Sequence, residues 1–333
     1  MKRTPSFWLF WGAVGTLIYT YVGFPLLLVV RGLFARRPVH AADVTPSVSL
    51  IVAAYNEADF IIKKLENAHQ VDYPRDQLEI IVVSDGSDDG TNDLVRAYNS
   101  SLVRLLELPR QGKNRALNAA IPLARNEILV FTDADSMLEP DALRKLVAPF
   151  ADPAVGGVAG NFQYAKGSVE GGGERTYWSF DRMLKELESN AGSVISATGQ
   201  LYAIRRELVP TIASGVTDDF FISVRAIMGG KRLVFAPDAI VSGPVSASDD
   251  AEFRRKVRIL MRGLNSVWLS RSLLNPLNYG FYALQLLSHK VLRRLMALPL
   301  IITALTAPLL WRRGWLYKCA TLGQFGFHAL ALI

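Results

Sequence analysis

Three apolar runs of strand length, each followed at once by carboxylates or amides, constrain the fold of this chain most strongly. The runs lie within residues 48–57 (VSLIVAAYNE), 78–91 (LEIIVVSDGSDDGT) and 127–135 (EILVFTDAD). Segments with helical spacing, such as 57–68 and 115–124, lie between them. Strands that alternate with helices form a parallel sheet, and ligands bind beyond the carboxyl ends of its strands. The sequence therefore predicts an α/β fold in which acid-rich loops meet at one edge of a mostly parallel sheet.

The N-terminal run of residues 4–30 carries no charged side chain and lies between Arg3 and Arg31. About 20 apolar residues are enough to cross the hydrocarbon core of a bilayer. The run therefore predicts a retained transmembrane helix within residues 1–33. A cleavable signal peptide is the alternative, but the apolar stretch is too long for one and lacks a small-residue cleavage site. Such segments explain why hydrophobic residues make up 50% of the chain.

The C-terminal part, residues 269–333, is predicted to hold an interfacial helix and further transmembrane helices. Residues 272–289 carry no Asp, Glu, Lys or Arg but contain Asn and Pro, and their aromatic residues suit headgroup depth. These aromatic residues are Tyr279, Phe281 and Tyr282. Residues 295–311 form an apolar run of marginal length that contains two prolines. The run 319–333 is apolar to the last residue, without a helix-ending signal.

The formal net charge of +7 indicates anionic partners. Basic residues cluster beside the predicted membrane segments, which favours lipid headgroups and a diphosphate substrate. Nucleic-acid binding would need aromatic residues interleaved with a basic face, so nucleic acid is not expected as a partner. The single cysteine, Cys319, excludes an internal disulfide and a cysteine-based metal site. The basic residues of these clusters are Arg31, Arg36, Arg37, Arg254, Arg255, Lys256, Arg258, Arg262, Lys290, Arg293 and Arg294.

Asp133 and Asp135 form the pattern with the clearest chemistry. They stand at i and i+2 at the end of a predicted strand, so both carboxylates can face one ligand. Mg²⁺ and Mn²⁺ prefer carboxylate oxygen and take further ligands from water and substrate phosphates. No histidine or cysteine lies nearby in the sequence, which argues against zinc. A solvated turn or a helix N-cap is the alternative, but the position after a buried strand favours a metal site.

The other polar loops contain candidate nucleotide contacts. Asp85 is a candidate acceptor for hydrogen bonds from a base or a ribose, and Gly86 and Gly90 would let a backbone approach closely. Its alternative is a loop that only forms a turn and caps a helix. Glu57 would either cap a helix or contact the nucleotide. Lys113 would either contact a phosphate or the base, or be an ordinary surface lysine.

Several segments, in order and at similar spacing, resemble those of family 2 glycosyltransferases. One of them, TDDF, resembles the Thr-Glu-Asp motif of that family, whose second acid is the catalytic base. Another, SHKVLR, resembles membrane members near the hyaluronan, chitin and related polysaccharide synthases. The resemblance to the catalytic part covers about residues 48–268. The segments are VAAYNE (52–57), SDGSDDGT (84–91), GKNRALN (112–118), FTDADS (131–136), ATGQLYAIRR (197–206), TDDF (217–220) and SHKVLR (288–293).

The resemblance implies a nucleotide-sugar-binding (GT-A-like) domain over residues 46–268 and an inverting transfer. Asp219 would be the catalytic base, for which an N-cap is the alternative role. Asp135, helped by Asp133, would hold Mg²⁺ or Mn²⁺. Gly199, Gln200 and Asp218 would lie on the acceptor or diphosphate side. The nucleotide-diphosphate sugar, UDP-linked by family habit, would contact Ala53, Tyr55, Glu57, Asp85, Lys113 and Asp133.

The sequence departs from the family in one motif. Processive members carry Gln-x-x-Arg-Trp before the membrane helices, whereas this chain has Arg255, Arg258 and Ile259 at those three positions. Arg258 and Arg262 would bind diphosphate, for which guanidinium is well suited, or belong to an amphipathic helix on lipid headgroups. The missing Trp favours a nonprocessive or short-product enzyme.

The resemblance also implies a cellular setting. Nucleotide sugars are supplied in the cytoplasm, so the catalytic domain is expected on the cytoplasmic side of the cell (inner) membrane. The expected enzyme moves a hexose or N-acetylhexosamine to a saccharide or lipid-linked acceptor, as a homo-oligomer or with partner subunits. One alternative is a polyprenyl-phosphate glycosyltransferase, whose acceptor needs no base. Another is a catalytically silent nucleotide-sugar-binding membrane protein, against which Asp133, Asp135 and Asp219 argue.

Overall fold

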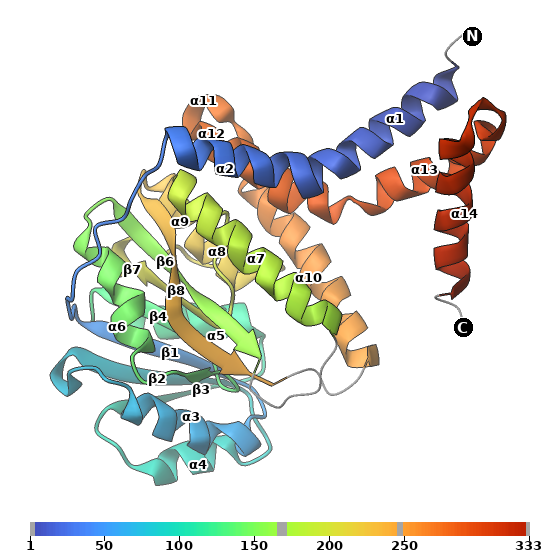
Figure 1. Ribbon diagram of the computed structural model, residues 1–333. Coiled ribbons are helices and arrows are strands. Elements are labelled where there is room, and N and C mark those ends of the chain that lie inside the picture. Colours follow the sequence, from blue (N-terminus) through green and yellow to red (C-terminus); the bar gives the residue numbers. More distant parts are fainter. Residues whose placement is uncertain (1–3, 165–171, 245–248, 331–333) are drawn as a thin grey trace.

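The computed structural model describes residues 4–164, 172–244 and 249–330, so the first three and last three residues of the expected membrane segments lie outside it. These residues form one eight-stranded sheet with the order β3-β2-β1-β4-β7-β6-β8-β5, flanked by helices (Figure 1). The strands are β1 (Val48–Ala54), β2 (Leu78–Asp85), β3 (Val103–Leu108), β4 (Ile128–Asp133), β5 (Met137–Leu138), β6 (Val155–Tyr164), β7 (Leu201–Arg205) and β8 (Arg232–Gly243).

The sheet is mixed, with a parallel half that holds the three predicted strands. β3, β2, β1 and β4 run parallel to one another, whereas β7 is antiparallel to both β4 and β6. In this register Ala53 of β1 pairs with Val83 of β2 on one side and with Asp133 of β4 on the other. The three strands therefore end at one edge, which confirms the predicted α/β fold and the convergence of their acidic loops.

Helices cover both faces of the sheet, because adjacent strand residues point to opposite faces and both sets are apolar. On one face, Leu50 packs in a core with α3, α4 and α6. On the other face, Ile51 packs in a second core with α5, α8 and α9. The helices are α3 (Ala58–Gln70), α4 (Thr91–Tyr98), α5 (Lys113–Ala120), α6 (Ala142–Val147), α7 (Gly172–Ala191), α8 (Asp218–Ser223), α9 (Arg225–Met228), α10 (Asp249–Leu269), α11 (Pro276–Tyr279) and α12 (Phe281–Gln285).

The segment expected to be a single interfacial helix is instead broken and partly packed on the second core. It contains a 3₁₀ turn (Arg271–Leu274), α11, α12 and a π-helical segment η7 (Leu286–Leu292). Tyr282 is buried in the second core, and its hydroxyl donates a hydrogen bond to Ile195 O at 2.8 Å. The expectation of headgroup depth is therefore wrong for Tyr282, because its ring fills a gap in the protein.

The N-terminal apolar run forms one bent helix. It consists of α1 (Pro5–Ile18), a π turn (Tyr19–Gly23) and α2 (Phe24–Phe34), and it changes direction near the π turn (Figure 1). Pro25 has no N–H to continue the α-helical ladder there, which explains the irregular turn. Taken together, Pro5–Phe34 is a 30-residue candidate membrane span. Its second half also packs on the part of the protein that contains the sheet, where Phe24 and Leu28 of α2 contact Leu184 and Ala191 of α7.

Two further helices follow at the C-terminal end, α13 (Ala297–Leu309) and α14 (Trp315–Leu330). Phe10 of α1 is buried against Ala307, Leu310 and Tyr317 of this region. Among the described residues, only Pro5–Phe34 is long and apolar enough to cross a bilayer alone. Phe281–Leu292 and Ala297–Leu309 reach that length only as a pair bent by 61°. The C-terminal membrane helices therefore stay a prediction.

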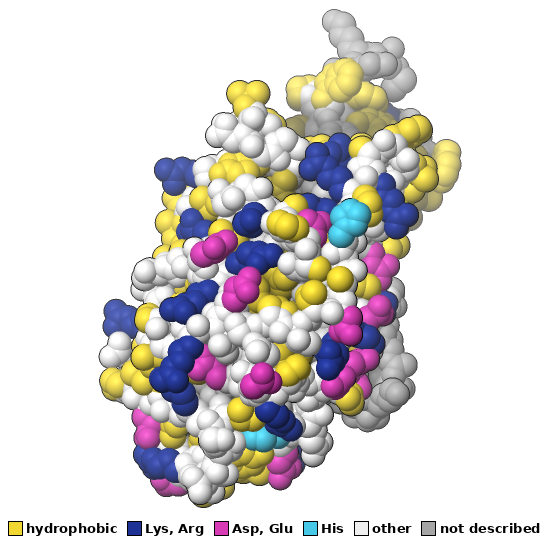
Figure 2. Space-filling model, turned by 90° about the vertical axis from the view of Figure 1, so that its left-hand side faces the viewer, with side chains coloured by type: hydrophobic (Ala, Val, Ile, Leu, Met, Phe, Trp, Pro, Cys, Tyr) yellow, Lys and Arg dark blue, Asp and Glu magenta, His cyan; other side chains and the backbone are white. Residues whose placement is uncertain are grey.

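The surface of the protein carries charges of both signs. On the face drawn in Figure 2, Lys and Arg side chains are interspersed with Asp and Glu side chains. Arg144 pairs with Asp72 at 2.8 Å, and Arg205 pairs with Glu127 at 2.9 Å. The excess positive charge of the sequence is therefore not gathered on the face that Figure 2 shows.

Candidate active site

Lys113, the first residue of α5, joins two acidic motifs that are far apart in the sequence. Its ammonium Nζ lies 2.7 Å from Asp133 Oδ1 at the end of β4 and 3.1 Å from Asp218 Oδ2 at the start of α8. The structure therefore brings the predicted donor-side and acceptor-side carboxylates together around one cation. Lys113 is not an ordinary surface lysine, and any contact with a phosphate or a base would be made from this bridging position.

Asp135 and Glu57 add two more carboxylates to this edge. Burial, and then the nearby Asp133 carboxylate, raise the pKa of Asp135. Burial, and then Asp135 and Asp133, raise the pKa of Glu57 to about 7. Carboxylates that raise one another's pKa in this way would be stabilised by a cation between them.

The donor atoms at this edge suit a hard divalent cation, because they are carboxylate oxygens. Asp135 is only partly buried, and its Oδ1 accepts a hydrogen bond from Ser136 Oγ at 3.1 Å. In the part of the chain that the structure describes, no three His, Cys, Asp or Glu side chains are grouped to hold a metal by themselves. A cation at Asp133 and Asp135 would therefore take its other ligands from substrate and water.

Lys64 of α3 forms hydrogen bonds to the residues on either side of these carboxylates. It was not among the predicted site residues. The side chain is fully buried, and Nζ donates hydrogen bonds to Thr132 Oγ1 at 3.0 Å and to Ser136 O. Thr132 Oγ1 in turn donates to Gln200 O at 2.9 Å. Lys64 thus ties both ends of the Asp133–Asp135 loop to the acceptor-side segment. The available signal was a lysine in the apolar stripe of a predicted helix, beside Leu65.

Asp85 organises a neighbouring loop of the protein itself. Its carboxylate accepts hydrogen bonds from Gln111 N at 2.8 Å, from Gly112 N at 2.9 Å and from the guanidinium of Arg110. The guanidinium of Arg110 also stacks on the ring of Tyr55, with 3.3 Å between its central carbon and the ring centroid. The predicted contact of Asp85 with a base or ribose would have to compete with these partners.

Gly86 allows a close approach, as the sequence predicted, but the approaching group is the chain's own backbone. Its φ is +73°, and an added Cβ would lie 2.5 Å from Arg110 N. Arg110 was not predicted, because nothing in its local sequence marks a stacking partner for Tyr55. The loop that contains Gly86 thus lies against the loop that contains Arg110. Together with the ring of Tyr55, the side chains of Asp85 and Arg110 form one surface, which we call the platform.

Asp89 caps the helix that follows β1, and Glu57 does not. Asp89 Oδ2 accepts a hydrogen bond from Ala58 N at 2.9 Å, and its Oδ1 accepts one from Thr91 N at 3.0 Å. Glu57 stands at the N-cap position of α3 but forms no capping hydrogen bond through its side chain. The capping alternative is therefore wrong for Glu57, whose carboxylate remains available to the site.

Asp219, the predicted base, is the second residue of α8. Its Oδ1 accepts a hydrogen bond from Phe220 N at 2.7 Å. Burial, and then the adjacent Asp218, raise the pKa of Asp219. A carboxylate with a raised pKa is a better general base near neutral pH than an exposed one.

Gly199 lies between the two sides of the site. An added Cβ would lie 3.9 Å from Asp219 Cβ and 4.0 Å from Asp133 Oδ2. The space beside Gly199 is therefore bordered by the candidate base and by a candidate metal ligand. The backbone carbonyl of Gln200 accepts the hydrogen bond from Thr132, which ties this segment to the end of β4; the predicted roles of Gly199 and Gln200 stay predictions.

Arg258 and Arg262 form no ion pair with these carboxylates among the described residues. Both side chains are exposed on α10. The last turns of α10 do reach the site, because Ser266 Oγ accepts a hydrogen bond from Thr217 N at 2.9 Å. The earlier turns expose Phe253 and Met261, with 70% and 65% of each residue accessible. This arrangement favours the amphipathic-helix alternative for both arginines.

Comparisons with known proteins agree with this geometry. A family model described as glycosyl transferase family 2 matches residues 49–212. Glycosyltransferase AglE of Haloferax volcanii is 30% identical over 234 residues, which are 67% of this chain and 75% of that protein. Poly-beta-1,6-N-acetyl-D-glucosamine synthase of Staphylococcus aureus is 28% identical over 235 residues. That match covers 67% of this chain but only 57% of the synthase.

One solved structure is similar over nearly the whole chain. It is mannosyltransferase PcManGT from Pyrobaculum calidifontis, in complex with GDP-Man and Mn²⁺. The two chains are 28% identical, with a TM-score of 0.67, and the match covers 97% of this chain and 98% of the other. The similarity therefore includes the N-terminal and C-terminal helices as well as the sheet.

Proposed function

This chain belongs to glycosyl transferase family 2, and we propose that it moves one sugar from a nucleotide-diphosphate sugar to a hydroxyl group of a saccharide or glycolipid acceptor. The transfer inverts the configuration at the anomeric carbon. The observation that carries this proposal is the bridge from Asp133 through Lys113 to Asp218, with Asp219 as the next residue. It supports a site in which a donor diphosphate and an acceptor hydroxyl meet.

Asp219 acts as the general base in this proposal. It removes the proton of the acceptor hydroxyl as that oxygen attacks the anomeric carbon, and the sugar–phosphate bond breaks on the opposite side. The nucleoside diphosphate leaves with the bonding electron pair. Gly199 leaves room beside Asp219 for the reacting groups, since an added Cβ would reach 3.9 Å from Asp219 Cβ. Positioning of the two substrates supplies much of the acceleration.

Asp135 and Asp133 would hold Mg²⁺ or Mn²⁺, which would neutralise charge on the diphosphate when bound. The raised pKa of Asp135 supports this assignment, because its burial beside Asp133 leaves negative charge to be balanced. Lys113 balances Asp133 and Asp218 from the protein side and keeps the two carboxylates in place. Mn²⁺ in the complex of the similar mannosyltransferase is a further support.

The donor is a hexose or an N-acetylhexosamine linked to UDP or GDP. The name of the similar N-acetyl-D-glucosamine synthase supports an N-acetylhexosamine, and GDP-Man in the mannosyltransferase complex supports a hexose. The platform of Tyr55, Arg110 and Asp85 would receive the base of either nucleotide, because stacking on an aromatic ring or a guanidinium tolerates different bases.

The reaction takes place at a membrane in this proposal, with the catalytic domain in the cytoplasm. The apolar Pro5–Phe34 helix supports the membrane location, since most of its span is exposed rather than packed in the protein. The exposed apolar residues and the basic residues of α10 would then contact lipid headgroups.

A donor panel tests the proposal. Detergent-purified chain would be incubated with GDP-mannose, UDP-N-acetylglucosamine and UDP-glucose, with membrane lipid extract as acceptor, in Mn²⁺ or in EDTA. We expect nucleotide release and a new glycosylated product from one donor, only with the metal. Metal-independent transfer would contradict the metal assignment. Nucleotide binding without turnover under every condition would favour the silent binding protein, and transfer to a polyprenyl phosphate that persists in Asp219→Asn would favour the other alternative.

A further inference from the structure

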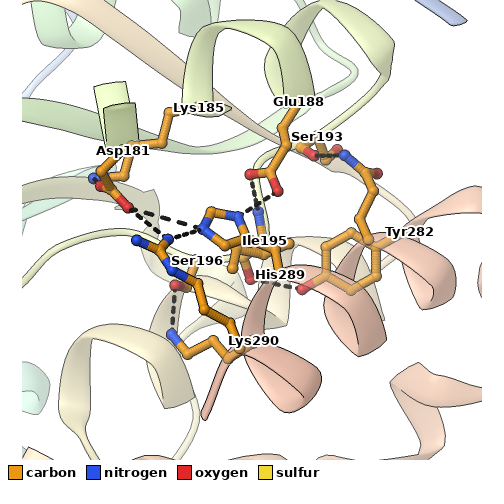
Figure 3. Close-up of polar contacts among 11 residues, drawn as sticks. Asp181, Lys185, Glu188, Ser193, Ile195, Ser196, Tyr282, His289 and Lys290 are labelled. Carbon is orange, nitrogen blue, oxygen red and sulfur yellow. Dashed lines mark hydrogen bonds and ion pairs between the residues drawn. The ribbon is translucent and has the colours of Figure 1, made fainter. Parts of the chain in front are cut away.

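A group of buried and half-buried polar side chains joins α7 to η7 (Figure 3). We name it the η7 junction. It comprises Asp181, Lys185 and Glu188 of α7, His289 and Lys290 of η7, and Arg293, the residue after η7. Lys290 and Arg293 were expected among the basic residues near headgroups, but the structure turns them toward the protein.

His289 is the centre of the η7 junction. Its Nδ1 lies 2.7 Å from Oε1 of the fully buried Glu188, and its Nε2 lies 2.9 Å from Nη1 of Arg293. Arginine can only donate, so Nε2 accepts and the ring proton sits on Nδ1, which donates to Glu188. Glu188 Oε2 also accepts from Ile195 N at 3.3 Å. These hydrogen bonds therefore fix both the rotation of the η7 segment about its own axis and its position along α7.

Lys290 follows directly and points toward the acceptor side. Its Nζ donates a hydrogen bond to Ser196 Oγ at 2.7 Å and lies 4.5 Å from the centroid of the Phe220 ring. Phe220 is the residue whose N–H donates to Asp219 Oδ1. Ser196 precedes the segment that carries Gly199. Lys290 thus contacts both acceptor-side segments at once.

The two lysines of the η7 junction differ in their partners. Lys185 Nζ lies 2.9 Å from Asp181 Oδ2 and is paired within α7. Lys290 has no carboxylate within ion-pair distance among the described residues, and Ser196 is its hydrogen-bond partner.

Several charged groups surround Lys290 and Asp219. The charge of Lys290 acts on Asp219 and opposes the rise in its pKa that burial and Asp218 cause. On the side of β7, the phenol of Tyr202 is a further titratable group that interacts with Asp219. Burial, and then Arg294, lower the pKa of Lys290 to about 7, whereas Asp219 and Asp181 act to raise it and Lys185 to lower it. Lys290 therefore carries its charge on the acidic side of neutral pH, where the acidic limb of a pH profile lies.

We propose that Lys290 is a positioning residue for Asp219: its ammonium, held by Ser196 and the η7 junction, keeps the Asp219 carboxylate charged in the catalytic site. This inference rests on the proposed function, in which Asp219 is the base. It also moves the functional boundary of the catalytic unit, because a domain ending at residue 268 would lack Lys290.

The same segment contacts the N-terminal apolar helix. Tyr19 OH lies 2.8 Å from Ser288 Oγ, and the rings of Phe24 and His289 are 6.2 Å apart. The N-terminal helix contacts Ser288 and His289, and the next residue is Lys290. The helix proposed for membrane attachment is therefore packed against the segment that carries Lys290.

The test uses the full chain and measures the pH dependence of kcat/KM for sugar transfer in Lys290→Met and Lys290→Arg. Loss of the ammonium in Lys290→Met should move the acidic limb of the profile upward by about one to two pH units. Lys290→Arg retains the charge and should keep the limb near that of the wild type. Lys63→Met, at an exposed lysine of α3, is the matched control and should behave as the wild type.

An acidic limb that stays in place in Lys290→Met, with the rate lowered equally in both Lys290 variants, would overturn the inference, since a merely structural residue gives that result. Ser196→Ala provides a second test if Lys290→Met does not fold; it keeps the charge but removes its anchor, and a smaller upward movement is expected. Failure of the proposed function gives a different result, because Asp219→Asn would then transfer sugar at the wild-type rate.

Discussion

Lys113 Nζ lies 2.7 Å from Asp133 Oδ1, so the carboxylate that ends β4 is balanced by a cation from the protein itself. This contact links the strand that carries the candidate metal ligands to the helix that begins at Lys113. The same ammonium reaches Asp218, so it connects the donor side of the site to the acceptor side.

Replacement of Lys113 by Met should therefore destabilise the protein in EDTA by about 1–2 kcal/mol, because Asp133 and Asp218 would face each other without a counter-charge. Thermal unfolding with and without Mn²⁺ checks this. Mn²⁺ should raise the Tm of Lys113→Met more than that of the wild type. Equal increases in both proteins would show that the cation site and the Lys113 bridge are independent.

Glu57 should make stability fall as pH rises through the weakly acidic range. Its pKa is about 7 in the folded protein against an ordinary value of 4.5, so the folded state holds the extra proton between those pH values. The free energy of unfolding should then decrease by at most about 1.4 kcal/mol per pH unit in this window. Urea unfolding in EDTA at pH 5 and pH 7 measures it. Glu57→Gln should flatten this slope, whereas the exposed Glu66→Gln should leave it unchanged.

Gly199→Val should block catalysis without unfolding the protein. An added Cβ meets only ordinary contacts, 3.9 Å from Asp219 Cβ and 4.0 Å from Asp133 Oδ2, but the larger side chain fills the space between them. We expect transfer to fall by about 100-fold and the free energy of unfolding to change by less than about 1 kcal/mol. Steady-state kinetics and urea unfolding of the same preparation provide the two numbers. Near-wild-type turnover would place the reacting groups elsewhere.

Gly86→Ala and Gly90→Ala separate a close backbone contact from simple backbone strain. Both glycines have positive φ, but an added Cβ at Gly86 would lie 2.5 Å from Arg110 N, whereas one at Gly90 meets nothing within 4 Å. Gly90→Ala should cost about 1 kcal/mol, and Gly86→Ala should cost more and weaken nucleotide binding, because Arg110 must move from Tyr55. Urea unfolding measures the cost in stability, and calorimetry measures nucleotide affinity. Equal nucleotide affinity in the two variants would show that the platform does not contribute to nucleotide binding.

The sequence predicted the parts of the site that depend on strand ends. Asp133 follows a buried apolar run, and the parallel pairing of its strand with β1 places it beside Ala53 without further information. Local pattern is enough there, because the carboxyl ends of neighbouring parallel strands meet at one edge.

The residues that were missed depend on contacts between distant segments. Lys64 reaches Ser136, Arg110 covers Tyr55, and Lys290 reaches Ser196, 94 positions away in the chain. Tyr282 was placed at headgroup depth for the same reason, since its aromatic, uncharged surroundings fit a membrane interface as well as a protein core. Only the packing of α12 on the second core distinguishes the two.

The most direct test of the central claim compares Asp219→Asn with Asp135→Asn in donor binding and in turnover. Calorimetry with nucleotide sugar and Mn²⁺ measures binding, and product formation measures kcat. We predict that Asp219→Asn binds donor as the wild type does but loses about 10²–10⁴-fold in kcat, whereas Asp135→Asn loses metal-dependent donor binding. Wild-type turnover in Asp219→Asn would contradict this claim, because the acceptor would then need no base at that position.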